Sequence, residues 1–204
     1  MDSRRLLYAV IVFARVGHVA SVVVATPVDH CASSTWGWGD SIRCGNTDGT
    51  INTGNVLDDS SADTFWGSGG IGNTGTTQGT HPHWISLDMG AVVSISSVFL
   101  KSRIGGGGEW TGGSVSIRLT TGSGTDPDAG LVNTCGVTST GVTGQEHTVA
   151  CPGMARYVYF YTNDIVSVAV DTMTVYKEAI STWVGGGNGY GAGTKLDLLG
   201  STIT

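Results

Sequence analysis

The sequence of 204 residues is long enough for one sizeable domain with short extensions. Its 33 glycines are far above the usual share of about 7%, and charged residues make up only 13% of the chain. A net charge of −6 with no basic stripe argues against nucleic acid as a partner. No long stretch after Pro27 shows the period of a helix, so the sequence indicates an all-β protein rich in turns.

The N-terminal segment 1–25 has two interpretations. Two arginines precede an apolar run over residues 6–14, and small residues around Ala25 offer an acceptable cleavage site, as in a signal peptide. Arg15 interrupts the apolar stretch and disfavours a transmembrane helix. We therefore expect either a signal peptide or, if the segment is retained, an N-terminal strand.

The four cysteines form two pairs that are local in sequence. Three pairings are possible, and we predict the disulfides Cys31–Cys44 and Cys135–Cys151 because each closes a short loop. Neither pair has the CxxC spacing of zinc or redox sites. Because disulfides persist in oxidising compartments, we expect a secreted, extracellular protein.

The stretch 81–103, HPHWISLDMGAVVSISSVFLKSR, has the clearest strand pattern. Ile85, Leu87 and Met89 alternate with the residues between them, which is the period of a half-buried strand. A glycine and an alanine interrupt the pattern, and a second apolar run follows over residues 95–101. The pattern predicts two consecutive strands.

Further alternation over residues 115–119, 157–161 and 166–170 predicts three more strands. In the last of these, the apolar residues then change parity, which indicates a β-bulge near Asp171 and Thr172. All these elements point to an antiparallel sheet with many turns.

The C-terminal extension, residues 179–204, differs from what precedes it. GGGNGYGAG is a flexible linker, and residues 194–204, TKLDLLGSTIT, are β-prone. Such a strand can add to its own domain or complete the sheet of a neighbouring copy, and head-to-tail exchange of strands produces filaments. A retained N-terminal segment could act in the same way, so both possibilities stay open.

Several motifs resemble one known family. WISLDMG over 84–90 is similar to the W-x-x-[VIL]-D-[LM]-G strand of discoidin and coagulation-factor type C domains, which the fucolectins share. The segments 55–68 (NVLDDSSADTFWGS), 109–117 (EWTGGSVSI) and 155–161 (ARYVYFY) resemble further motifs of that family in the same order. The resemblance implies an antiparallel β-sandwich jelly roll of the galactose-binding type over residues 26–178.

The same resemblance implies a calcium site. Fucolectins bind calcium through an asparagine, an aspartate three residues later and a polar residue two further on, followed by a ligand from the last strand. The implied ligands are Asn55, Asp58, Ser60, Ser68 and Asp171. A turn of carboxylate and amide oxygens suits a hard cation such as Ca²⁺. The alternative is a solvated acidic turn in which Asp58 caps backbone N–H groups.

Fucose recognition in the family uses a histidine and two arginines. Arg103 matches the first arginine, but Trp110 occupies the place of the second, and no histidine lies at the expected position. We therefore predict that fucose binds poorly. The candidate ligand-binding residues are Arg103, Trp110, His83 and Trp84, because tryptophan can stack on a sugar ring. Arg103 could instead be a surface residue paired with Glu109.

The sequence contains no serine-hydrolase elbow, zinc-protease motif or phosphate loop, so we do not expect an enzyme. Two functions from different classes are consistent with it. The first is a secreted, calcium-stabilised, lectin-like module that binds a glycan or glycoprotein. The second is a structural subunit of an extracellular filament or coat, a homo-oligomer assembled through exchanged terminal strands.

Overall fold

The computed structural model describes the chain between residues 22 and 202 with gaps. The described residues are 22–33, 42–45, 53–57, 66–67, 82–104, 115–138, 144–163 and 168–179, and the backbone of 197–198 and 201–202. The strands are β1 (Val22–Ala25), β2 (Asp29–Ala32), β3 (Arg43–Cys44), β4 (Trp66–Gly67), β5 (His83–Ser102), β6 (Val115–Thr120), β7 (Leu131–Val137), β8 (Glu146–Thr162), β9 (Ala169–Glu178), β10 (Asp197–Leu198) and β11 (Ser201–Thr202), with one 3₁₀ helix, η1 (Thr53–Leu57).

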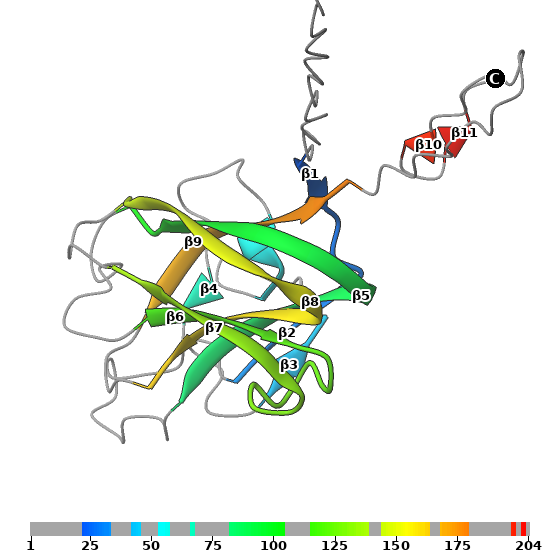
Figure 1. Cartoon of the computed structure of the whole chain (residues 1–204). Coiled ribbons are helices and arrows are strands. Elements are labelled where there is room, and N and C mark those ends of the chain that lie inside the picture. The colour runs from blue at the N-terminus through cyan, green and yellow to red at the C-terminus, as the bar shows by residue number, and fades with distance from the viewer. Residues whose placement is uncertain are drawn as a thin grey trace, which may run out of the picture.

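The main sheet is antiparallel and has nine strands among the described residues. Its order is β1-β9-β5-β8-β6-β7, with β2 added to β5, β3 to β2 and β4 to β9. Figure 1 shows the sheet folded over on itself into two layers. The predicted all-β, antiparallel jelly-roll architecture is therefore confirmed.

The long strands β5 and β8 connect the two layers. The first arm of β5 pairs with β2 and β8, and its second arm pairs with β8 and β9. The register shifts between Asp88 and Val93, on either side of Gly90, whose φ is +75°. A side chain at Gly90 would lie 3.2 Å from Val28, so glycine permits both the left-handed backbone and the close packing. The two strands predicted for 81–103 are thus the two arms of one bent strand.

Because β5 runs out in one layer and returns in the other, its two ends lie on the same side of the sandwich, away from the bend (Figure 1). We call this side the loop end. The bend itself and the segment 121–130, which connects β6 to β7, lie on the opposite side (Figure 1). This arrangement decides which functional residues can act together.

The main core lies between the two layers. Alternate residues of each strand enter it, such as Ile85 and Leu87 of β5 and Val158 and Phe160 of β8. Trp66 of β4 is fully buried there and meets the ring of Phe160 edge-on, with 6.3 Å between centroids. Each large side chain buried in this way stabilises the fold by about 1.5–3 kcal/mol.

A second buried cluster lies on the other face of β5 and β8. It contains Cys31, Trp84, Tyr159 and Tyr161, with Tyr157 packed against it. Both faces of these strands are therefore covered, which differs from the half-buried strand that simple alternation predicts. The bulge predicted near Asp171 is confirmed: Lys101 pairs with Thr172 and Ser102 with Val170, so Asp171 is the extra residue.

The two terminal segments take different positions. β1 pairs with β9 at the edge of the main sheet, so residues 22–25 of the segment predicted as a signal peptide or strand lie in the sheet. β10 and β11 pair with each other in a separate two-stranded sheet rather than as one continuous strand. The described residues contain no helix that is long and apolar enough to cross a membrane.

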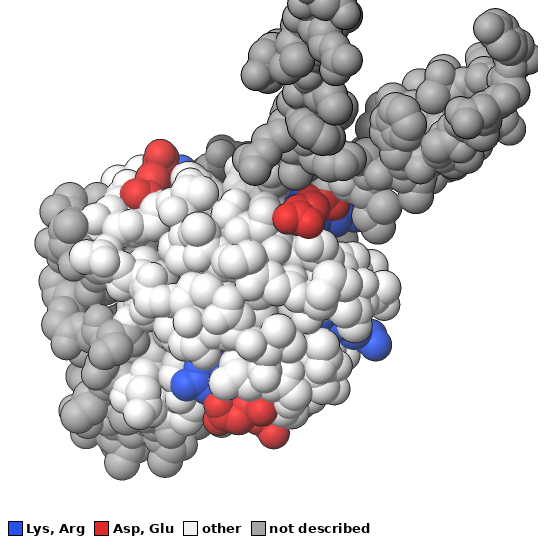
Figure 2. Space-filling model, viewed as in Figure 1, with Lys and Arg blue, Asp and Glu red and all other residues white. Residues whose placement is uncertain are grey.

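The face shown in Figure 2 carries few charged side chains among the described residues, and most lie in small groups of both signs. No stripe of lysine and arginine crosses the described part of this face. The observation agrees with the low charge content of the sequence.

Candidate functional sites

Three of the four residues predicted to bind a ligand lie at the loop end. His83 and Trp84 begin β5, and Arg103 directly follows its last residue. However, His83 is 1% exposed and Trp84 is 4% exposed. The indole of Trp84 packs edge-on against Tyr159, with 5.4 Å between ring centroids. Both side chains are therefore buried in this structure, and their direct contact with a ligand stays a prediction.

Arg103 lies at the loop end, where its side chain is half-buried. Its backbone N–H donates to the carbonyl of Ala169, which ties the end of β5 to the start of β9. The fourth residue, Trp110, lies outside the described residues. Direct contact of Arg103 or Trp110 with a sugar therefore stays a prediction.

The predicted calcium ligands are only partly described. Asp58, Ser60 and Ser68 lie outside the described residues, whereas Asn55 is buried on η1 and η1 packs against β9. Asp171 lies on β9 and is 2% exposed. The described residues contain no group of three or more His, Cys, Asp or Glu side chains arranged to hold a metal.

The carboxylate of Asp171 has two different oxygens. Oδ2 lies 3.1 Å from Nζ of Lys101, and this buried ion pair holds the bulge of β9 against β5. Oδ1 is buried and has no hydrogen-bond partner among the described residues. Because a buried carboxylate oxygen without a partner is costly, Oδ1 is a position where a further donor or cation would be stabilising.

Both predicted disulfides are confirmed. Cys31–Cys44 joins directly opposed residues of β2 and β3, and Cys135–Cys151 joins β7 to β8. Cys151 is fully buried, whereas Cys44 is exposed. The first disulfide fastens the short strand β3 to the sheet beside a second candidate site, described next.

A cavity of about 270 Å³ lies on the outer face of the first arms, between β2, β5 and the segment 121–130. We call it the outer-face pocket. Its lining residues come from β2, β8, the first arm of β5 and the segment 121–130, and that segment lies on the side of the bend (Figure 1). Its polar and aromatic lining includes Asp29, Ser86, Asp88, Ser123, Thr125 and Tyr157.

The strand register places these residues on one face. Asp29 lies directly opposite Asp88, and Asp88 lies directly opposite Tyr157. Arg156 donates to both carboxylate oxygens of Asp88, at 2.9 Å each. This hydrogen bonding holds the pKa of Asp88 below its usual value and raises the pKa of Arg156. The guanidinium also lies over the ring of Tyr157, at 5.0 Å from the centroid.

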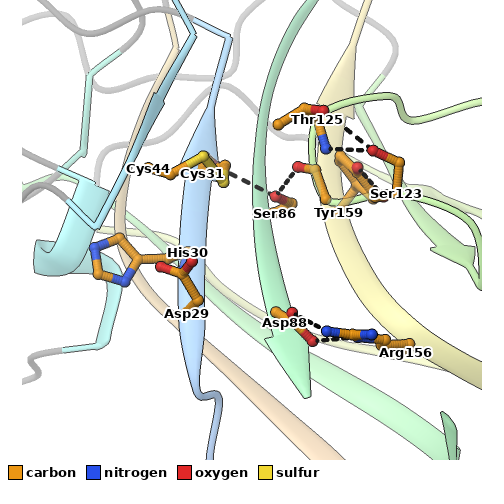
Figure 3. Close-up of a disulfide and its surroundings, with 11 residues drawn as sticks. Asp29, His30, Cys31, Cys44, Ser86, Asp88, Ser123, Thr125, Arg156 and Tyr159 are labelled. Carbon is orange, nitrogen blue, oxygen red and sulfur yellow. Dashed lines mark hydrogen bonds and ion pairs between the residues drawn. A yellow bond between two sulfur atoms is a disulfide. The ribbon is translucent and has the colours of Figure 1, made fainter. Parts of the chain in front are cut away.

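The segment 121–130 forms the roof of the pocket, and two of the hydrogen bonds that tie it to the sheet come from Tyr159 and Ser86 (Figure 3). The hydroxyl of Tyr159 donates to the carbonyl of Ser123 at 2.5 Å. Oγ of Ser86 donates to the carbonyl of Gly124 at 2.6 Å. Burial raises the pKa of Tyr159, so its phenol keeps the proton that it donates.

Sequence reasoning missed the outer-face pocket because its residues come from four separate segments. The signal that was present is weak: Ser86 and Asp88 are polar residues at alternate positions of β5, and the roof contains the turn Asp126-Pro127-Asp128. Nothing in the sequence shows that the roof folds back over these two side chains.

No protein-family model matches the chain, and no curated protein matches it. Among solved structures, a truncated AlyQ with CBM32 and alginate lyase domains is similar, with a TM-score of 0.52, 17% identity and coverage of 80% of this chain. An f-lectin (fucolectin) from Morone saxatilis (striped bass) serum has a TM-score of 0.53, 13% identity and coverage of 74% of this chain. The matches span 35% and 45% of those two chains.

At these identities the likeness concerns the fold. The chain has the galactose-binding type of jelly roll that the fucolectin has, and the resemblance drawn from the sequence motifs is confirmed at this level.

Proposed function

We propose that this chain is a non-catalytic, extracellular carbohydrate-binding module whose ligand site lies at the loop end. The observation that carries the proposal is the fold shared with an f-lectin and with a chain that contains a CBM32 domain. Arg103 stands at the loop end with a half-buried side chain, and a guanidinium can donate several hydrogen bonds in a fixed geometry to sugar hydroxyls. The two disulfides agree with an oxidising extracellular environment.

A glycan array with the full chain tests this function. We expect binding to a subset of saccharides, with weak or no preference for L-fucose because the family's arginine–histidine set is incomplete. Arg103→Gln should weaken binding by about tenfold or more, since each lost charge-assisted hydrogen bond is worth roughly 1.5–3 kcal/mol. The matched control is Lys177→Gln, which removes a cation from β9. An array without any binding, or equal binding by Arg103→Gln, would contradict the proposal.

We also propose a structural calcium ion near η1 and the bulge of β9. The buried Oδ1 of Asp171 and the packing of η1, which carries Asn55, against β9 support it. Asn55 and Asp171 would supply oxygen ligands, together with Asp58, Ser60 and Ser68. Lys101 already neutralises the other oxygen of Asp171, so the ion would need further anionic ligands.

Thermal unfolding with calcium and with chelator tests the metal proposal. A ligand that binds only the folded state at 100 times its dissociation constant stabilises by about 2.7 kcal/mol. We expect the midpoint to fall on chelation, and to be insensitive to calcium in Asp171→Asn. An equal midpoint in saturating calcium and in chelator would reject the site.

A second candidate function is a filament or coat subunit. The observation that favours it is that β10 and β11 pair only with each other in the described backbone, outside the main sheet. Deleting residues 185–204 should abolish concentration-dependent assembly while leaving the stability of the monomer unchanged. A chain that is monomeric at every concentration would leave only the carbohydrate-binding function.

A further inference from the structure

We propose that the outer-face pocket is a second ligand site, separate from the loop end, for a single sugar unit that carries a free amine. The proposal does not depend on Arg103. Asp88 lies on the first arm of β5, whereas Arg103 follows the end of the second arm, beyond the bend at Gly90. A ligand in the pocket would therefore contact β2, β5, β8 and the roof, and none of the residues of the loop end.

The size of the pocket indicates a small ligand. Its volume of about 270 Å³ is below the range of roughly 300–1,000 Å³ that is typical of sites for drug-sized ligands. The cavity therefore suits one sugar ring, with longer chains leaving through its open side. Tyr157 supplies an aromatic wall against which the apolar face of a sugar ring can pack.

The charges of the pocket favour a cation. Asp29 and Asp88 face each other directly across β2 and β5, an arrangement of like charges that is unfavourable by itself. Arg156 compensates Asp88 by taking both of its oxygens. Asp29 is exposed and accepts only the backbone N–H of His30, at 2.7 Å, and no lysine or arginine among the described residues pairs with it. One negative charge in the pocket is thus left without a counter-charge.

An ammonium group at Asp29 would complete this arrangement. It would form a charge-assisted hydrogen bond, which is about twice as strong as a neutral one. The same carboxylate would accept from a neutral hydroxyl more weakly and would repel an anionic sugar. The amine of the ligand therefore determines its preference for this pocket.

The roof supplies the partners for neighbouring hydroxyls. The side-chain oxygens of Ser123 and Thr125 lie 3.1 Å apart and can each donate and accept. They stay in place because Tyr159 and Ser86 hold the backbone carbonyls of the same segment. The pocket thus presents the hydroxyls of Ser123 and Thr125 and the carboxylate of Asp29, which matches a sugar that carries both hydroxyl groups and an amine.

Titration of the ¹⁵N-labelled full chain with glucosamine, glucose and glucuronate tests the proposal. We expect glucosamine to shift the amide signals of the roof and of Tyr157, with an affinity at least about tenfold higher than that of glucose. Binding should weaken with added salt, as expected for an exposed charge pair. Glucose binding as tightly as glucosamine, or shifts confined to the loop end, would overturn the proposal.

Two variants locate the interaction, and melting curves verify that each is folded. Asp29→Asn should reduce glucosamine affinity about tenfold, whereas Glu178→Gln, which removes an exposed carboxylate from β9, should not change it. Thr125→Val, which removes only a hydroxyl from the roof, should weaken glucosamine and glucose alike. Full affinity in both Asp29→Asn and Thr125→Val would reject the site.

Arg103→Gln separates this proposal from the proposed function. Glucosamine binding that survives Arg103→Gln supports a second site, even if no glycan binds at the loop end. Glucosamine binding that is lost in Arg103→Gln and kept in Asp29→Asn would assign the amine preference to the loop end and overturn the proposal.

Discussion

Replacing Tyr159 with phenylalanine should loosen the roof of the outer-face pocket without disturbing the packing below it. The side chain is fully buried, and its ring meets Trp84 edge-on. The substitution keeps the ring and removes only the hydroxyl that donates to the carbonyl of Ser123. The carbonyl of Ser123 is partly buried and also accepts a longer hydrogen bond, of 3.5 Å, from Oγ1 of Thr120, so the loss of the tyrosine hydroxyl should cost about 1 kcal/mol. For a domain of this size, each kcal/mol lowers the melting temperature by roughly 2–4 °C.

Two measurements decide whether the roof is the part affected. Thermal unfolding should show the loss of stability, and hydrogen exchange should accelerate at the amides of Thr121 and Gly122, which donate to carbonyls within the roof. Tyr176→Phe is the matched control, because the hydroxyl of Tyr176 makes no hydrogen bond with the described residues. Wild-type stability and exchange in Tyr159→Phe would refute the reasoning.

A double-mutant cycle sharpens this prediction. Ser86 and Tyr159 are directly opposed on β5 and β8, and they hold adjacent carbonyls of the roof. If the roof closes as one unit, the free-energy effects of Ser86→Ala and Tyr159→Phe should deviate from additivity by about 0.5 kcal/mol or more. Additive effects would mean that each carbonyl is held independently.

Three further predictions concern single features of the fold. Gly130→Ala should lower the free energy of unfolding by roughly 1–2 kcal/mol, because φ at this position is +65° and the new Cβ would lie 2.7 Å from Oγ1 of Thr121. Gly136 has open space around it, so Gly136→Ala should be nearly neutral in the same melting experiment. Graded reduction with mass mapping of free thiols should open Cys31–Cys44 first, since Cys44 is exposed and Cys151 is buried. Loss of Cys135–Cys151 should then cost about 3 kcal/mol. The destabilisation caused by Asp88→Asn should be present at neutral pH and vanish as the pH falls below about 4. The reason is that Asp88, whose pKa is lowered in the folded state, stabilises the fold only while its carboxylate is charged. An equal effect at pH 7 and pH 2 would contradict it.

The sequence was sufficient to predict the fold class, both disulfides and the bulge of β9. Each of these rests on short-range patterns: the alternation of apolar residues, the spacing of cysteines and a change of parity near Asp171. The motif that begins at Trp84 also pointed to the correct type of jelly roll. Local patterns of this kind are preserved in the structure because the strands that carry them are regular.

The same reasoning did not predict the burial of Trp84, and the physical cause is the second buried cluster. Alternation shows which residues share a face of a strand, and Trp84 does share a face with Ser86 and Asp88. It does not show that the outer face is also covered. Long-range pairing of β5 with β2 and β8 brings Trp84 against Tyr159, where the indole is buried.

The bend of β5 connects these successes and failures. In the sequence, Gly90 separates two strand patterns, and this pattern is consistent either with a loop between two strands or with a bend within one strand. In the structure it is a corner, so the residues before and after it are carried to the same loop end while Asp88 stays beside the bend. The bend at Gly90 therefore separates Arg103, which follows the second arm at the loop end, from the outer-face pocket beside the first arm. Because Arg103 is not among the residues that line the pocket, substitutions at Arg103 can vary a sugar site without altering the pocket.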